Sequence, residues 1–171
     1  MNKITTKDMV IMSLLIAITI VLSRFLSIST PIIKIGFSFV PITIAGILYG
    51  AKYTMLISII ADLIGATLIT GDFFPGFTVT TALVGIVYGK FLYNKSKSVK
   101  NIVLCVVIAN LIELILNTGN IYLLSGYGFL ATLPVRSFKA LLMIPIKALV
   151  IYNVSYPIAS MKNMVSKKRV V

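Results

Sequence analysis

Six long runs of apolar residues, separated by short polar segments, constrain this chain more than any other feature. They cover approximately residues 9–28, 37–49, 53–69, 77–93, 102–124 and 135–158. Most of them reach the roughly 17–25 residues that a helix needs to cross a bilayer. Hydrophobic residues make up 58% of the chain and charged residues only 12%. A soluble fold of this size could not bury so many apolar side chains, so the sequence predicts an integral membrane protein.

The runs predict helices rather than the strands of a barrel, because they are continuous and lack the alternation of a lipid-facing strand. We therefore expect an all-α membrane protein, with residues 1–171 forming one domain of six transmembrane helices. The first run is long enough to span and lacks the short apolar core of a signal peptide. Pro145 and Pro157 predict a kink in the last span.

Lysine and arginine residues predict the orientation. Eleven of the sixteen fall on the side of the N-terminus: Lys3, Lys7, Lys52, Lys90, Lys95, Lys97, Lys100, Lys162, Lys167, Lys168 and Arg169. The positive-inside rule then places both termini in the cytoplasm, which requires an even number of spans. The outer connections, at 27–36, 70–77 and 125–134, carry glycine, proline and aromatic residues that favour ordered binding loops.

Composition excludes several functions. The net charge of +12 fits basic residues facing anionic lipid, so we expect no nucleic-acid partner. The chain has no histidine, and we expect neither a metal site nor a cofactor in it. Its one cysteine, Cys105, lies in an apolar run and is assigned to packing. An enzyme would need acidic, histidine or cysteine residues around one cavity, whereas Asp62, Asp72 and Glu113 lie on different segments.

Charged side chains within the spans are costly to insert and need a reason. Arg24, Arg136 and Lys139 lie near the outer ends of their spans. They either extend to the membrane interface or form a receptor for an anionic ligand. Lys147 lies deeper, and it either pairs with Glu113 or reaches toward the cytoplasmic edge.

Acidic and aromatic residues could complete a site for a ring-containing ligand. Asp62 and Glu113 either form structural ion pairs or accept hydrogen bonds from a heterocycle, and Asn117 lies one turn after Glu113. The aromatic residues near the outer mouth either form an interfacial belt or stack on a flat ligand; these are Phe73, Phe74, Phe77, Tyr122 and Tyr127. Together these groups suit an anionic, ring-containing vitamin.

Ser13 and Ala17 form a pair of small residues one turn apart on the first span. Such spacing allows another helix to approach closely. The pair either faces a partner subunit or packs within the chain.

These residues resemble a known family, the substrate-binding components of energy-coupling factor (ECF) vitamin transporters, and its folate-specific branch in particular. The resemblance covers residues 8–160 and rests on the order and spacing of short motifs. They are LSRFL at 22–26, FVPI at 39–42, LYG at 48–50, DLIG at 62–65, FPGFT at 74–78, GIVYG at 85–89, NT at 117–118 and LPVR at 133–136.

The resemblance implies a six-helix protein of the bacterial cell membrane that binds a vitamin at its outer side. It implies that Ser13 and Ala17 face a membrane-embedded coupling subunit and that two cytoplasmic ATPases use the ATP. The chain has no phosphate-binding G-x-x-x-x-G-K-[ST] motif of its own. Folate is the ligand that fits best, and riboflavin and pantothenate are the alternative ligands. A membrane protein without a role in transport is the alternative class. The expected ligand-binding residues are Arg24, Asp62, Phe74, Phe77, Thr78, Asn117, Tyr122, Arg136 and Lys139.

Overall fold

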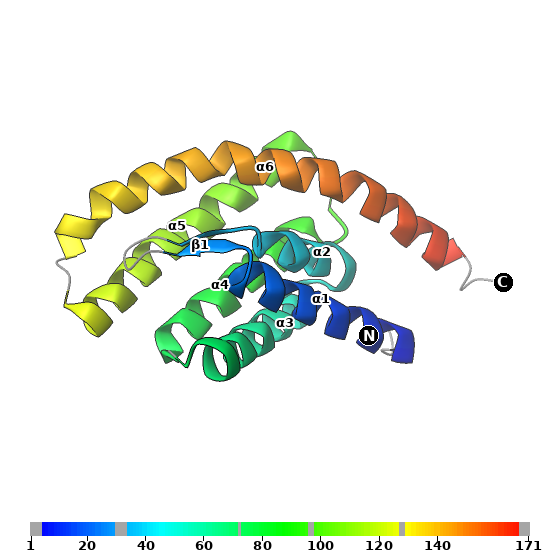
Figure 1. Ribbon diagram of the computed structural model, residues 1–171. Coiled ribbons are helices and arrows are strands. Elements are labelled where there is room, and N and C mark those ends of the chain that lie inside the picture. The colour runs from blue at the N-terminus through cyan, green and yellow to red at the C-terminus, as the bar shows by residue number, and fades with distance from the viewer. Residues whose placement is uncertain (1–4, 30–33, 72, 96–97, 127–128, 168–171) are drawn as a thin grey trace.

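The computed structural model describes residues 5–29, 34–71, 73–95, 98–126 and 129–167. Within these ranges the elements are α1 (Thr6–Arg24), β1 (Ser27–Ser29), β2 (Lys34–Gly36), α2 (Phe39–Tyr49), α3 (Ala51–Ile64), the π-helix η1 (Gly65–Thr70), α4 (Pro75–Leu92), α5 (Val99–Ser125) and α6 (Phe129–Lys167) (Figure 1). Five helices in this part of the chain are long and apolar enough to cross a membrane, and α2 is a shorter apolar helix. The predicted all-α architecture with six helices is confirmed.

The first helix is fixed at both ends by local polar contacts. At its start, Thr5 and Asp8 form a reciprocal cap, in which the Asp8 amide donates to Thr5 Oγ1 at 3.3 Å and the Thr5 amide donates to Asp8 Oδ2 at 3.0 Å. The expectation that this helix extends to residue 28 is wrong. The helix ends at Arg24, because β1 and β2 pair as an antiparallel hairpin that places Ser27 opposite Gly36.

Glycine allows a sharp turn between α2 and α3. Gly50 alone separates the two helices, and its φ of +78° is a conformation that residues with a side chain rarely adopt. On the neighbouring helix, a Cβ at Gly89 would lie 2.3 Å from Ala51 Cα. Backbone therefore packs directly on backbone here, and α4 lies close to the turn.

The core is built around α4, which contacts α3 on one side and α5 on the other. Tyr88 of α4 is fully buried, and Cys105 of α5 is buried beside it in the same cluster, as expected for a packing residue. Helix α6 covers α5 and α2 and contributes Met143 and Ile151 to this core. Any side chain that α5 and α6 direct toward each other is therefore shielded from lipid.

The last helix is longer than expected. It begins at Phe129, so most of the predicted outer loop at 125–134 is helical and Pro134 lies inside the helix. Pro145 and Pro157 also lie inside, yet α6 remains one element and bends as a gradual arc (Figure 1). Helix α1 begins and α6 ends on the same side of the bundle (right in Figure 1), as expected for two cytoplasmic termini.

Candidate functional site

A stripe of polar residues runs along one face of α5. Asn110, Glu113, Asn117 and Asn120 are spaced by three, four and three residues, which places them on one side of a helix. Helix α6 opposes this stripe with basic residues. The two helices enclose a cavity of about 30 Å³ lined by Asn110, Glu113, Leu114, Asn117, Arg136, Lys139, Ala140, Met143 and Lys147.

An ion pair between a buried lysine and a half-buried glutamate closes the deep end of this cavity. The Lys147 ammonium group donates to Glu113 Oε2 at 2.9 Å and to Asn110 Oδ1 at 2.7 Å. Asn110 in turn donates from Nδ2 to the carbonyl of Ala140 at 3.4 Å. The Lys147 side chain is only 6% exposed, so it pairs with Glu113 and does not reach toward the cytoplasmic edge.

The outer end of the cavity contains a hydrogen-bond acceptor without a donor among the described residues. Arg136 donates from Nη1 to the backbone carbonyl of Asn117 at 3.3 Å. The side-chain Oδ1 of Asn117 is buried and has no hydrogen-bond partner among the described residues. Lys139 is half-buried in the same wall. Three cations and one carboxylate thus line the cavity, which favours an anionic group that can also donate to Asn117.

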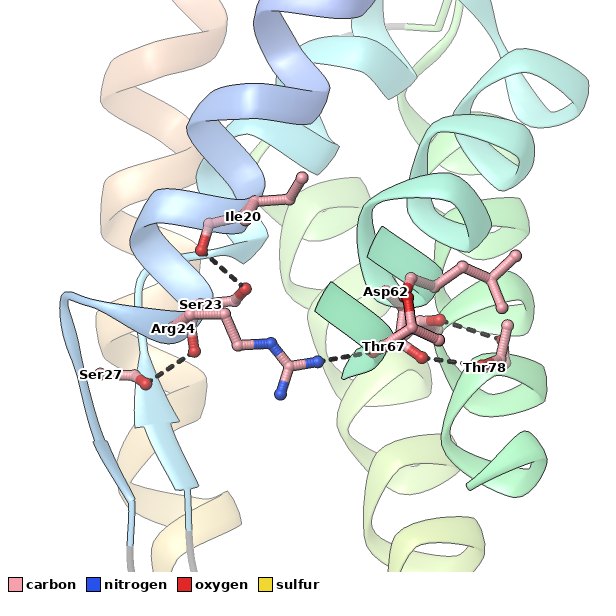
Figure 2. A network of polar contacts seen from close by, with 9 residues as sticks. Ile20, Ser23, Arg24, Ser27, Asp62, Thr67 and Thr78 are labelled. Atoms are coloured by element: carbon pink, nitrogen blue, oxygen red, sulfur yellow. Dashed lines mark hydrogen bonds and ion pairs between the residues drawn. The ribbon is translucent and has the colours of Figure 1, made fainter. Parts of the chain in front are cut away.

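A second polar cluster joins α1, α3 and α4 (Figure 2). Arg24 extends from the end of α1, and its Nη2 lies 3.5 Å from Asp62 Oδ1, while Thr78 donates to Asp62 Oδ2 at 2.8 Å. A Cβ at Gly65 would lie 2.7 Å from Arg24 Nε, so glycine makes room for the guanidinium group. Both oxygens of Asp62 therefore have partners within the chain, in contrast to Asn117 Oδ1.

Aromatic residues flank the start of α4. The rings of Phe74 and Phe77 meet edge to face with centroids 5.8 Å apart, and both side chains are half-buried. Tyr122 is 51% exposed and is not among the residues that line the polar cavity. Phe73 is 42% exposed. Tyr127 and Asp72 lie outside the described residues.

Helix α4 stands between the two polar clusters. Thr78 faces Asp62 of α3, whereas Thr80 accepts a hydrogen bond of 3.3 Å from Asn120 Nδ2 on α5. Asn120 also packs on Gly76, where a Cβ would lie 2.2 Å from Asn120 Oδ1. The structure thus brings Arg24, Asp62 and Thr78 together in one group and Asn117, Arg136 and Lys139 in another.

Sequence reasoning missed Asn110, Asn120 and Thr80. The regular spacing of Asn110, Glu113, Asn117 and Asn120 was a usable signal, because four polar residues on one face of a membrane helix predict a polar interior. Only Glu113 and Asn117 were recognised from it.

Comparison with known proteins places this architecture in one family. Residues 7–155 match the family of the ECF transporter, substrate-specific component. The folate transporter FolT of Clostridium novyi is 38% identical over 147 residues, which is 85% of this chain and 86% of that protein. The folate transporter FolT of Leuconostoc mesenteroides is 34% identical over 160 residues, or 88% and 85% of the two chains.

A solved structure agrees with these relatives. The crystal structure of FolT bound with folic acid superposes with a TM-score of 0.85 at 30% identity, and the match covers 88% of this chain and 93% of that one. The chain belongs to the family of substrate-specific components of ECF transporters.

Proposed function

We propose that this chain is the folate-binding subunit of an ATP-driven vitamin transporter, and that it captures folate from the outer side of the membrane. Two observations support the proposal. Relatives named as folate transporters match most of the chain. The polar cavity between α5 and α6 combines excess positive charge with an unsatisfied acceptor.

The chemistry of folate matches this cavity. Its glutamate tail carries two carboxylates, which Arg136 and Lys139 would bind, and its amide and ring carry N–H groups that would donate to Asn117 Oδ1. A cavity of about 30 Å³ holds no more than a water-sized group, so binding would require α5 and α6 to separate at their outer ends. The Phe74–Phe77 pair and Tyr122 would then stack on the ring, while Arg24, Asp62 and Thr78 would hold α1 and α3 against α4.

Transport would require partners. The exposed face of α1 presents Ser13 and Ala17, and the Ser13 hydroxyl is satisfied by the Met9 carbonyl at 2.9 Å. This face would contact a membrane-embedded coupling subunit, and two cytoplasmic ATPases would supply the energy of ATP hydrolysis. Residues 1–171 would act together as one binding unit.

We predict that the purified chain binds folate without transporting it. Folate should be the small molecule that copurifies from cells grown in rich medium, as identified by mass spectrometry. Riboflavin and pantothenate should fail to displace it. Copurification of either of those vitamins instead would identify a different substrate. Accumulation of folate in liposomes that contain this chain alone, without ATP, would contradict the proposed need for a coupling module.

Substitution Arg136→Ala should weaken folate binding by about one to two decades, because a charge-assisted hydrogen bond is worth roughly 1.5–3 kcal/mol. Isothermal titration calorimetry on the detergent-solubilised chain measures the change. Lys90→Ala is the matched control, because Lys90 is exposed in the last turn of α4. This variant should bind folate as the wild type does. Unchanged folate affinity in a folded Arg136→Ala variant would mean that Arg136 extends to the membrane interface and does not bind the ligand.

A further inference from the structure

An apolar groove lies between α5 and α6, next to the deep end of the polar cavity. It measures about 290 Å³ and is lined by Val99, Ile102, Val103, Pro145, Ala148, Leu149 and Tyr152. Val99 is the first residue of α5, and Asn117 lies about 27 Å further along that helix. The groove therefore extends to the cytoplasmic end of the two helices, and it shares no lining residue with the polar cavity, although Ala148 directly follows Lys147 on α6.

The walls of the groove determine the kind of occupant. Every lining residue except Tyr152 is purely apolar, and both helices cross the membrane. The volume far exceeds the roughly 30 Å³ that one water molecule takes. An empty groove at hydrocarbon depth would forfeit dispersion contacts along its length, whereas an acyl chain would restore them. The small side chains of Pro145 and Ala148 leave this space between α5 and α6.

The charges beside the groove indicate which lipid headgroup would accompany such an acyl chain. Lys100 follows Val99 directly, Lys95 lies in the preceding connection, and both are exposed. Residues 73–112 contain no aspartate or glutamate, so no acidic residue of this segment offsets those lysines. Lysines at the cytoplasmic surface attract anionic lipids.

A pair of tyrosines on α6 supports the same placement. Tyr152 lines the groove and meets Tyr156 edge to face, with ring centroids 5.7 Å apart. Tyrosines concentrate at the level of the headgroups, where the ring is apolar and the hydroxyl is wet. We propose that this groove binds one anionic phospholipid of the cytoplasmic leaflet, with an acyl chain along Ala148 and the headgroup at Lys100.

The test compares phosphatidylglycerol with phosphatidylcholine of identical acyl chains, using native mass spectrometry of the full chain. The wild type should prefer phosphatidylglycerol by about fivefold, the factor that corresponds to one lysine at an anionic surface. Lys100→Gln should remove this preference, and Ala148→Trp should remove the bound lipid of either type. Lys52→Gln and Leu111→Trp, at exposed positions outside the groove, are the matched controls and should behave as the wild type.

Three results would overturn the proposal: no headgroup preference in the wild type, retention of lipid by Ala148→Trp, or an unchanged preference in Lys100→Gln. Lys100→Gln is a surface change that folding should tolerate, so the headgroup assignment is testable even where Ala148→Trp misfolds. Retained lipid together with lost assembly of the transporter in Ala148→Trp would assign the groove to a protein partner instead. Folate affinity, measured on the same samples, should be unchanged, which separates this proposal from the proposed function.

Discussion

Ala17→Trp should abolish ATP-driven folate uptake by the assembled transporter while it leaves the folate affinity of the isolated chain nearly unchanged. Ala17 and Ser13 lie on the exposed face of α1, and only Leu15 and Thr19 of this helix are buried. Small residues one turn apart let another helix approach closely, and an indole ring at this position would hold it away. Arg24, which was expected from the sequence to bind the ligand, is about 10 Å further along the axis of the same helix.

Both quantities must be measured on one preparation: affinity by calorimetry, and uptake in proteoliposomes that contain the coupling subunit and the ATPases. Leu104→Trp is the matched control, because Leu104 is 49% exposed on α5 and lies on a different helix from the proposed contact face. Normal uptake by Ala17→Trp would mean that the coupling subunit approaches another surface. Parallel loss of binding and uptake would indicate that the small pair serves packing within this chain.

The helices could be predicted from the sequence because a bilayer imposes their length and forbids unpaired backbone groups. The residues at which the helices begin and end could not be predicted in this way. Residues 25–28 are apolar enough to continue α1, but pairing of Ser27 with Gly36 takes the chain into a hairpin. Residues 129–134 contain a proline and follow glycines, yet they belong to α6. Hydropathy measures burial in lipid, and it does not distinguish a short strand or a proline-containing helical turn from a loop.

The charged residues of the candidate site were visible in the sequence, and Glu113 was one of two alternatives for Lys147, but Asp62 was not predicted as the partner of Arg24. Lys147 pairs with Glu113 across 34 positions, and Arg24 reaches Asp62 across 38. Such pairs depend on which helices are neighbours and on how each is rotated about its axis. The repeat of polar residues on α5 gives the rotation of that helix, whereas the choice of α6 as its neighbour requires the three-dimensional packing.

Lys147→Met should destabilise the protein by about 1–3 kcal/mol, because it leaves the half-buried Glu113 carboxylate without its counter-charge. It also leaves Asn110 Oδ1 without the donor that now lies 2.7 Å away. The double substitution Lys147→Met with Glu113→Gln should recover much of this loss, since no uncompensated charge remains. Unfolding of the four combinations in mild detergent, followed by circular dichroism, gives the coupling energy of the pair.

Lys139→Met is the matched control for this cycle. Lys139 lines the same cavity, but it makes no hydrogen bond or ion pair with the described residues, so its removal should change stability by less than about 1 kcal/mol. Equal losses in Lys147→Met and Lys139→Met would mean that positive charge as such, rather than the ion pair, stabilises the α5–α6 contact. Because the pair lies at the deep end of the cavity, a stable double variant would also show whether Glu113 is needed for folate. Unchanged affinity there would leave Arg136, Lys139 and Asn117 as the residues that bind the ligand, with Lys147 and Glu113 holding the two helices together beneath it.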